Sequence, residues 1–450
     1  MTKLRRLFRN TTVLIVANAL QPVLSFYLIV TISRELGVDG LGAYATVFNY
    51  LAIFQILAGF GLKNLLTRNV AQQPEQVRHY LWHGSLVVVP FSLLGIAGLI
   101  ALIYFLDYGE LLLSATALLS LALIAAALID VCEGVLGGVE RLHIVGYSAV
   151  LENVARVVAS LVVLKQGFGL IALVLVFVVS RFVRAGYYYW YLHRHVVPFA
   201  ADSSQDQQSR WRWDWPFVRH LVSQARVFAM TMVCVTVYWK IDVSILSKVR
   251  GMEEVGLYSA AYRFLMIAFV VIDSFVNSLF PIISSFYRGS TGGEEQTSGQ
   301  FALACKKGLQ LLLLLSLPVA LVVSAFADQI ILLVYGEEFT AAIPVLRILI
   351  CLVVPYAISQ IFAYALVASN NQRYDLFVNA VSMLASVGLN WVLIGKFGYI
   401  GAAWAALASI TIYVGLQVPF IFRNVLAFEM KRLWLGGMKV LAAAGAKVGS

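Results

Sequence analysis

The stretch GAYATVFNYLAIF at residues 42–54 returns in the second half of the chain as GLYSAAYRFLMIAF at residues 256–269. A second pair follows in the same order, KQGFGLIAL at 165–173 and IGKFGYIGAA at 394–403. Each member of a pair has the same place within its half of the chain. We therefore predict two structurally equivalent halves.

The composition around these repeats is that of a membrane protein. Of the 450 residues 61% are hydrophobic and 12% are charged, whereas soluble domains are roughly 45–50% apolar and about 25% charged. The apolar residues come in blocks close to the ~20 residues that cross a bilayer as a helix. Only helices and closed β-barrels can cross the lipid core, because the core offers backbone groups no hydrogen-bond partner. The blocks lack the alternation of barrel strands, so the predicted fold class is all-α.

Breaks at Gly, Pro and charged residues divide these blocks into about twelve transmembrane helices. The predicted spans are 11–33, 41–62, 84–106, 110–132, 144–165, 169–191, 222–247, 255–285, 303–327, 343–368, 376–395 and 399–422. Six spans fall in each half, which gives two six-helix bundles of the same topology, related by a pseudo-two-fold axis along the membrane normal.

Basic residues gather on the loops of one face of this arrangement, the face that carries both ends of the chain. By the positive-inside rule both termini are predicted to be cytoplasmic. The same pattern accounts for the net charge of +10 without a nucleic-acid partner. The predicted divisions are an N-terminal lobe at 1–192, a cytoplasmic linker at 193–221, a C-terminal lobe at 222–423 and a basic cytoplasmic tail at 424–450.

Three shorter segments are not simple spans. Residues 63–80 are predicted to form a helix at the cytoplasmic surface and 328–341 an amphipathic helix at the outer surface. The stretch 433–446 is too short for a full span and is expected to be a truncated or surface-lying thirteenth helix.

The four cysteines, Cys132, Cys234, Cys305 and Cys351, lie inside apolar segments without CxxC spacing or nearby histidines. This pattern indicates packing residues rather than a disulfide or zinc site. The histidines form no metal-ligand pattern either, and we predict no metal and no cofactor.

Four stretches carry a family resemblance. They are SRELGVDGLGAYATVF at 33–48, KIDVSILSKVRGMEEVGLYSAAYRF at 240–264, YGEEFTAAIPVLRIL at 335–349, and NNQRYDLFVNAVSMLASVGLNWVLIGKFGYIGAAWAAL at 370–407. In these stretches the chain resembles the polysaccharide transporter (Wzx or RfbX type) flippases of the multidrug/oligosaccharidyl-lipid/polysaccharide (MOP) superfamily.

The resemblance implies two lobes around a cavity that opens alternately inward and outward. It implies transport of an undecaprenyl-diphosphate-linked oligosaccharide, a repeat unit of O-antigen, capsule or exopolysaccharide, across the bacterial cytoplasmic (inner) membrane, driven by gradients rather than ATP. The expected partners are this lipid-linked oligosaccharide, the bilayer, and a polysaccharide polymerase with its chain-length machinery.

Charged residues inside predicted spans are the first candidates for binding a diphosphate, because such groups are costly in lipid and are usually functional. Lys240 and Asp242 lie in span seven and Arg263 at similar depth in span eight. These three residues are predicted to form one cluster. An ion pair between Asp242 and Arg263 that locks the two helices together is the structural alternative.

The further candidates are polar residues of the first two spans and arginines that the family resemblance places near the mouths of the cavity. They are Asn18, Gln21, Asn49, Gln55, Arg34, Arg68 and Arg226. The amides can hydrogen-bond sugar hydroxyls or bind helices to one another, and the arginines can meet the phosphate or mark the membrane edge.

Two residues are candidates for the transport cycle itself. Asp273 in span eight is the candidate for coupling to a proton, with pairing or simple hydrogen bonding as its alternative. Pro22 is the candidate hinge of the first helix, with a static kink as its alternative.

Three arginines of the first half have structural explanations. Glu152 and Arg156 are four residues apart and are expected to neutralise each other on one helix face. Arg181 and Arg184 are expected to extend toward the cytoplasm as topology determinants.

Two other function classes compete with the flippase. A drug or cation antiporter of the same superfamily predicts a committed acidic cluster in the N-terminal lobe, whereas spans one and two hold no central acid. A membrane polymerase or ligase of lipid-linked glycans needs reactive groups gathered in a sizeable outer loop or cavity, and the outer loops are short. No P-loop motif is present, and we predict a transporter rather than an enzyme.

Overall fold

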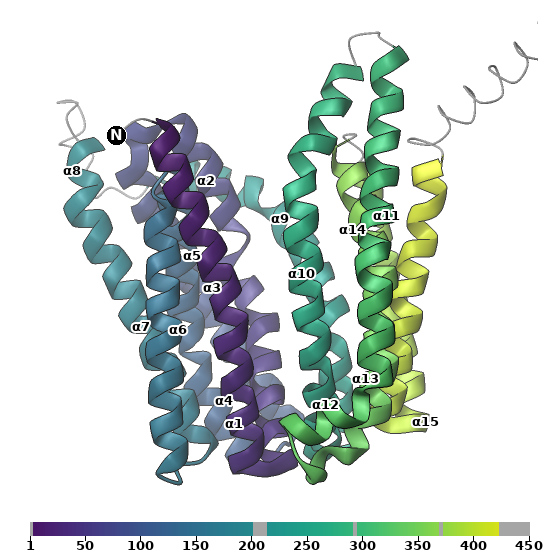
Figure 1. Cartoon of the computed structure of the whole chain (residues 1–450). Coiled ribbons are helices and arrows are strands. Elements are labelled where there is room, and N and C mark those ends of the chain that lie inside the picture. Colours follow the sequence, from purple (N-terminus) through teal and green to yellow (C-terminus); the bar gives the residue numbers. More distant parts are fainter. Residues whose placement is uncertain (1–2, 201–213, 291–294, 369–371, 423–450) are drawn as a thin grey trace, which may run out of the picture. The chain divides into compact units, whose positions relative to one another are not determined.

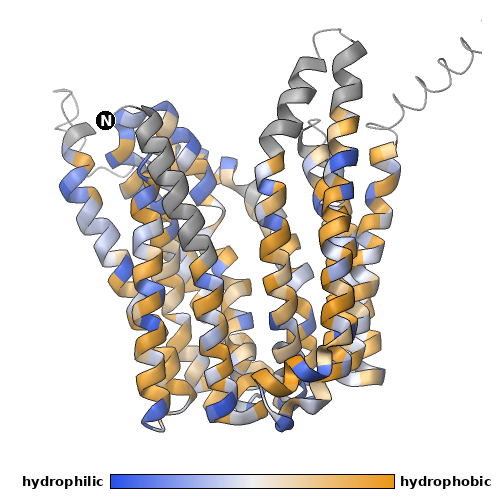
Figure 2. Cartoon of the chain, viewed as in Figure 1, coloured by the Kyte–Doolittle hydropathy of each residue, from blue (hydrophilic) through white to orange (hydrophobic). Residues whose placement is uncertain are grey.

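A computed structural model describes residues 3–200, 214–290, 295–368 and 372–422 of the chain, and this part is helical, without a strand (Figure 1). Hydrophobic residues dominate the middle of the helices (Figure 2). The predicted thirteenth helix at 433–446 lies outside the described residues, as do the side chains of Asn18 and Arg226.

The described chain divides into two compact units. Unit 1 is Met1–Ser259 with Val334–Glu338, and unit 2 is Ala260–Leu333 with Phe339–Ser450. The helices of unit 1 are α1 (Lys3–Gly59), α2 (Leu62–Gln72), η1 (Pro74–Gln76), α3 (Val77–Phe105), α4 (Glu110–Ser120), α5 (Ala122–Gly138), α6 (Leu142–Lys165), α7 (Leu170–His195), α8 (Val197–Ala200), α9 (Trp215–Val249) and the start of α10 (Met252–Ser290). Unit 2 holds the rest of α10, then α11 (Glu295–Ala325), most of α12 (Ala327–Val334), most of η2 (Glu337–Ala342), α13 (Ile343–Ile350), α14 (Val353–Ala368) and α15 (Gln372–Ile421).

The helices agree with the predicted set of spans. Among the described residues, nine apolar helical runs are long enough to cross a membrane. Two of these runs, Leu20–Gln72 and Tyr374–Pro419, each overlap two predicted spans, which are separated by a kink at Gly37 (φ 68°) or Gly398 (φ 58°). Predicted span seven lies in α9, whose 35 residues are about 52 Å long. The chain is therefore an all-α, multi-pass membrane protein.

Two predicted spans are interrupted. Span four is divided at Leu121 into α4 and α5, next to Ser120, whose hydroxyl donates to the Ala117 carbonyl at 2.7 Å and so competes with the helical backbone. Span ten is divided between α13 and α14, just before Pro355, which lacks the amide hydrogen that a continuous helix requires.

The predicted linker is largely helical at its two ends. α7 continues to His195, α8 follows at Val197–Ala200, and α9 begins at Trp215, while residues 201–213 lie outside the described part. The predicted lobe boundaries at 192 and 222 follow the polar stretch between spans six and seven and not the contacts that separate the two units, and they remain a prediction.

The glycines of the first repeat pair make a reciprocal contact within unit 1. A Cβ atom on Gly42 would overlap the carbonyl of Met252, four residues before Gly256. A Cβ atom on Gly256 would overlap the carbonyl of Val38, four residues before Gly42. Each repeat thus packs its glycine on the helix start of the other, the pattern of a two-fold interface.

Small residues also bring α2 against α5. A Cβ atom on Gly134 would lie 2.7 Å from the Lys63 carbonyl, and one on Gly138 would lie 2.6 Å from Cβ of Val70. Glycines at helix interfaces allow backbones to approach closely within a membrane. This packing places the start of α2 beside the middle of α5, where the charged residues of the next section meet.

Candidate functional site

A chain of ion pairs connects four helices inside unit 1. Lys63 Nζ of α2 lies 2.5 Å from Glu133 Oε2 of α5. The other carboxylate oxygen of Glu133 pairs with Arg184 of α7, and Arg184 Nη1 lies 2.9 Å from Glu152 Oε2 of α6. Arg181 Nε of α7 approaches Glu152 Oε1 at 3.5 Å. The carboxylates of Glu133 and Glu152 are therefore each shared between two cations.

Hydroxyl groups complete the hydrogen bonding of this network. The Tyr188 hydroxyl donates to Glu133 Oε1 at 3.1 Å and accepts from the Ser148 hydroxyl at 2.7 Å. Ser180 donates to Glu152 Oε1 at 3.4 Å. Glu133 is only 8% exposed and the Arg184 side chain only 10%, so these partners replace the water that the charges lose.

A polar pocket of about 370 Å³ lies at the α2 end of the network. Gln55, Lys63, Asn64 and Asp130 supply its polar lining, and Met232 of α9 supplies part of its apolar lining. A cation, a carboxylate and two amides are the groups that bind phosphate oxygens and sugar hydroxyls.

Asp130 has room in this pocket because Gly59 faces it. A Cβ atom at position 59 would lie 2.9 Å from Asp130 Oδ2. Among the described residues no cation lies within ion-pair distance of the Asp130 carboxylate. Its charge is therefore available to a ligand in the pocket.

Predicted residues of the second and seventh spans hold neighbouring helices of unit 1 together. Asn49 Nδ2 donates to the Lys240 carbonyl at 3.0 Å and to Ser244 Oγ at 2.9 Å. Asp242 accepts from the Tyr258 hydroxyl at 2.6 Å and from the Val243 amide at 2.7 Å. Asn49 and Asp242 thus have structural partners within unit 1.

A hydroxyl cluster lies beside this contact, at the turn between α3 and α4. The Tyr108 hydroxyl lies 2.8 Å from the hydroxyls of both Tyr50 and Ser247. Burial raises the pKa of Tyr108 above its usual value, so the phenol stays protonated and can donate a hydrogen bond.

The candidate arginines also have partners in unit 1. Arg34 donates from Nε and Nη2 to the Val334 carbonyl, at 3.1 and 2.8 Å, and so caps the end of α12. Arg68 Nη2 donates to Gln224 Oε1 at 3.0 Å and lines a small polar pocket of about 200 Å³.

Near the candidate hinge Pro22, α1 contacts α6. The Gln21 carbonyl accepts a hydrogen bond from Asn153 Nδ2 at 3.2 Å. Of the candidate amides with described side chains, only Gln55 lines the polar pocket.

Asp273 is the centre of a separate cluster in unit 2. Its Oδ1 accepts from the Tyr356 hydroxyl at 2.7 Å and from Gln360 Nε2 at 2.8 Å. The Tyr356 ring stacks on Phe269 with a centroid distance of 3.7 Å. Arg263 also belongs to unit 2, whereas Lys240 and Asp242 belong to unit 1, and their predicted cluster remains a prediction.

The predicted pairing of Glu152 with Arg156 needs correction. Glu152 pairs with Arg184 and Arg181 rather than with Arg156, because the Arg156 guanidinium donates to Asn153 Oδ1 at 2.6 Å. Arg181 and Arg184 are held in ion pairs with the carboxylates of Glu152 and Glu133, and their predicted role as topology determinants remains a prediction.

The sequence interpretation also missed Lys63, Asp130 and Glu133. The sequence feature that could have indicated the two acids is their spacing. Asp130 and Glu133 are three residues apart at the end of a predicted span, which puts both on one helix face. Buried acids of a membrane helix require cationic partners, and Arg184 supplies one. Among the described residues, no group of three or more His, Cys, Asp or Glu side chains is arranged to hold a metal ion.

Comparison with known proteins identifies the family of the chain. The sequence profile of the family described as polysaccharide biosynthesis protein matches residues 7–287, more than half of the chain. The chain belongs to this polysaccharide biosynthesis family. The profile of the MatE family matches residues 228–392, which places this polysaccharide biosynthesis protein in the MOP superfamily.

One curated relative of this protein comes from Haloferax volcanii. It is the "probable low-salt glycan biosynthesis flippase Agl15", 23% identical over 446 residues that cover 98% of this chain and 89% of the relative.

Solved structures share the fold of the chain. The lipid II flippase MurJ in an inward closed conformation matches with a TM-score of 0.71 at 16% identity, over 95% of this chain and 92% of MurJ. An inward-facing multidrug resistance transporter of the MATE family also matches with a TM-score of 0.71, at 14% identity, over 91% of this chain and 96% of the transporter. The two-lobed helical transporter fold is thus shared by flippases and drug exporters.

Proposed function

We propose that the protein flips an undecaprenyl-diphosphate-linked oligosaccharide across the bacterial cytoplasmic membrane. The observation that carries this proposal is the polar pocket of unit 1, where Lys63, Asp130 and Gln55 face one space among apolar membrane helices. A lipid-linked sugar needs both kinds of partner there, a cation for its phosphates and amide or carboxylate groups for its hydroxyls. Membership of a polysaccharide biosynthesis family and similarity to a glycan flippase over nearly the whole chain support the same substrate class.

In this proposal Lys63 binds a phosphate oxygen of the substrate, and Gln55 and Asp130 bind sugar hydroxyls. Lys63 is 48% exposed while its partner Glu133 is 8% exposed, so the ammonium group is accessible to a ligand without unfolding of the network. Arg263 and Lys240 are further phosphate candidates. The protein acts as a transporter by alternating access and makes or breaks no covalent bond.

We assign the energy coupling to Asp273, as a group that gains and loses a proton during transport. It accepts hydrogen bonds from Tyr356 and Gln360, which join α10 to α14, so a change at this carboxylate would reach the contact between the two helices. The distribution of basic residues supports a cytoplasmic location for both chain termini. A polymerase and its chain-length machinery would receive the exported unit.

A second candidate function is export of cationic drugs. It is favoured by Asp130, whose carboxylate lines the pocket without a cation in ion-pair distance among the described residues, since a carboxylate that faces a pocket in the first half of the chain is what a cation antiporter requires. Deletion of the gene would then raise drug sensitivity and leave surface glycans unchanged.

The flippase proposal is tested in cells that lack the protein, with a periplasmic enzyme that tags sugars on the outer leaflet. Intact lipid-linked repeat units that accumulate without a tag support a flippase. Tagged units that remain unpolymerised would point to a polymerase, and an unchanged glycan profile with raised drug sensitivity would favour the antiporter.

A further inference from the structure

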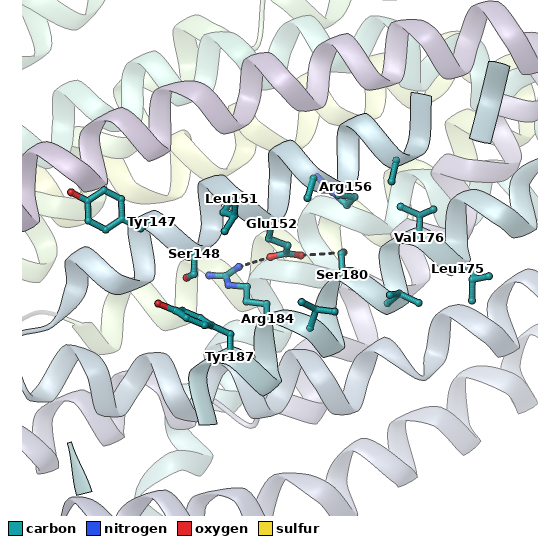
Figure 3. Close-up of a pocket in the computed structure, with 14 residues that line it drawn as sticks. Tyr147, Ser148, Leu151, Glu152, Arg156, Leu175, Val176, Ser180, Arg184 and Tyr187 are labelled. Carbon is teal, nitrogen blue, oxygen red and sulfur yellow. Dashed lines mark hydrogen bonds and ion pairs between the residues drawn. The ribbon is translucent and has the colours of Figure 1, made fainter. Parts of the chain in front are cut away.

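A groove with a charged floor runs between α6 and α7 on the exposed face of unit 1 (Figure 3). Its volume is about 700 Å³. The walls are apolar side chains that face outward, among them Leu151, 71% exposed, and Val183, 66% exposed. Exposed aliphatic residues on a membrane helix face lipid, so the groove is open to lipid chains.

The floor of the groove carries an excess of positive charge. Glu152, Arg156 and Arg184 line it, with the hydroxyls of Ser148 and Ser180 (Figure 3). Arg184 is neutralised by Glu152 and Glu133. Among the described residues, Arg156 has no carboxylate within ion-pair distance, and its guanidinium donates a hydrogen bond to Asn153.

Arg156 also has an unused donor. Its Nε atom is buried and has no hydrogen-bond partner in the described part of the chain. Its guanidinium lies 5.4 Å from the centre of the Phe177 ring, and the guanidinium of Arg181 lies 5.0 Å from the same centre. Two guanidinium groups therefore lie near one ring, and Arg156 has no carboxylate partner to balance its charge, which favours the approach of an anion.

The depth of Arg156 limits what this anion can be. Arg156 lies 14 residues from the start of α6 at Leu142 and nine from its end at Lys165, about 21 and 13 Å along the helix. These distances put the guanidinium well inside a hydrocarbon core about 30 Å thick. The phosphate of a resident bilayer lipid stays at the membrane surface, whereas the phosphate of a lipid that is being flipped passes this depth.

We propose that the groove between α6 and α7 is a lateral path for the lipid-linked substrate, with the phosphate bound by Arg156 and the polyprenyl chain in the surrounding lipid along Leu151 and Val183. This inference rests on the proposed flippase function and adds a substrate contact outside the polar pocket. The charged floor compensates the phosphate for its lost water, and the open side of the groove leaves the long chain in the membrane throughout.

The test uses the full chain in phosphatidylcholine vesicles and, as probe, a fluorescent sugar on a polyprenyl diphosphate that carries a diazirine in its chain. Movement between leaflets is followed by quenching from outside, and photolabelled peptides are mapped. Ala155→Trp fills the groove, and Arg156→Gln removes the phosphate partner. Val162→Trp is the control, since Val162 is a half-exposed residue of α6 outside the groove lining.

We expect the unsubstituted protein and Val162→Trp to flip the probe and to be labelled within residues 147–187. Ala155→Trp and Arg156→Gln should flip it about tenfold more slowly or worse and lose the label. If Arg156→Gln does not fold, Ala155→Trp still tests the groove as the path, because this variant retains the arginine.

Two results would overturn the inference, and they are distinct. If Ala155→Trp flips and is labelled as Val162→Trp is, the path lies elsewhere while the flippase function stands. If the folded, unsubstituted protein does not move the probe at all, the proposed flippase function is wrong. The groove is then not a substrate path either.

Discussion

Replacement of Gly42 by alanine should open the contact between the two repeats. The added Cβ atom would overlap the Met252 carbonyl, a backbone group that no side-chain rotation can move aside. Overpacking of this kind costs about 1–3 kcal/mol, and the rigid neighbour favours the upper end. Each 1.4 kcal/mol is about a tenfold change in an equilibrium constant. We therefore expect the ratio of molecules with this helix contact formed to molecules with it separated to fall roughly a hundredfold.

The reciprocal geometry makes the prediction sharper. Gly256→Ala should have an effect of similar size, because its Cβ atom would meet the equivalent carbonyl, that of Val38. The double variant should lose less than the sum of the two single losses, since one separation of the helices relieves both overlaps. Two independent packing sites would give additive losses instead.

The assay combines unfolding in detergent with labelling of a cysteine at Ser247, in a background without the four native cysteines. Ser247 is 3% exposed and its hydroxyl bonds to Tyr108, so a cysteine there should react slowly until the contact opens. Gly186→Ala is the matched control, because Gly186 is a helical glycine with open space around its Cβ position. The reasoning is refuted if Gly42→Ala labels and unfolds as the control does.

Three further predictions concern the charged residues. Glu133→Gln should lower the free energy of unfolding by about 3 kcal/mol, the low end for a broken buried ion pair. The loss is at the low end because Lys63 is half exposed and screened and Arg184 retains Glu152. Denaturant titration measures the loss, and a loss equal to that of the exposed variant Glu75→Gln would contradict the prediction. Lys63→Gln should slow flipping about tenfold or more in vesicles while Lys63→Arg retains most of the rate, and equal rates for the two variants would remove Lys63 from the phosphate site. Asp273→Asn should leave binding of the lipid-linked sugar intact and abolish acceleration of flipping by an imposed proton gradient, so a variant that still responds to the gradient would exclude Asp273 as the coupling group.

The sequence predicted the helices of this protein well because hydropathy reports the thickness of the bilayer directly. The repeat of Gly42 and Gly256 likewise predicted two equivalent halves, and the reciprocal contact of these glycines agrees with it. Interruptions at Leu121 and before Pro355 were missed, since a short break in a buried apolar helix leaves the average hydropathy unchanged.

The partners of the charged residues were harder to predict than the helices that carry them. Spacing along α6 favoured a Glu152–Arg156 pair, but Asn153 takes the Arg156 guanidinium and α7 supplies the cations for Glu152. Which face of a helix meets which neighbour depends on its rotation about its own axis. That rotation is set by contacts such as Gly134 against Lys63, between residues far apart in the sequence.

The most direct test of the central claim is transport by the purified protein in sealed vesicles that hold a fluorescent undecaprenyl-diphosphate-linked sugar and an imposed proton gradient. A sugar hydrolase added outside reports how much of the lipid reaches the outer leaflet. We predict that the protein accelerates this movement and that Lys63→Gln abolishes most of the acceleration. Folded protein that leaves the sugar in its original leaflet, with the gradient present, would contradict the assignment as a flippase.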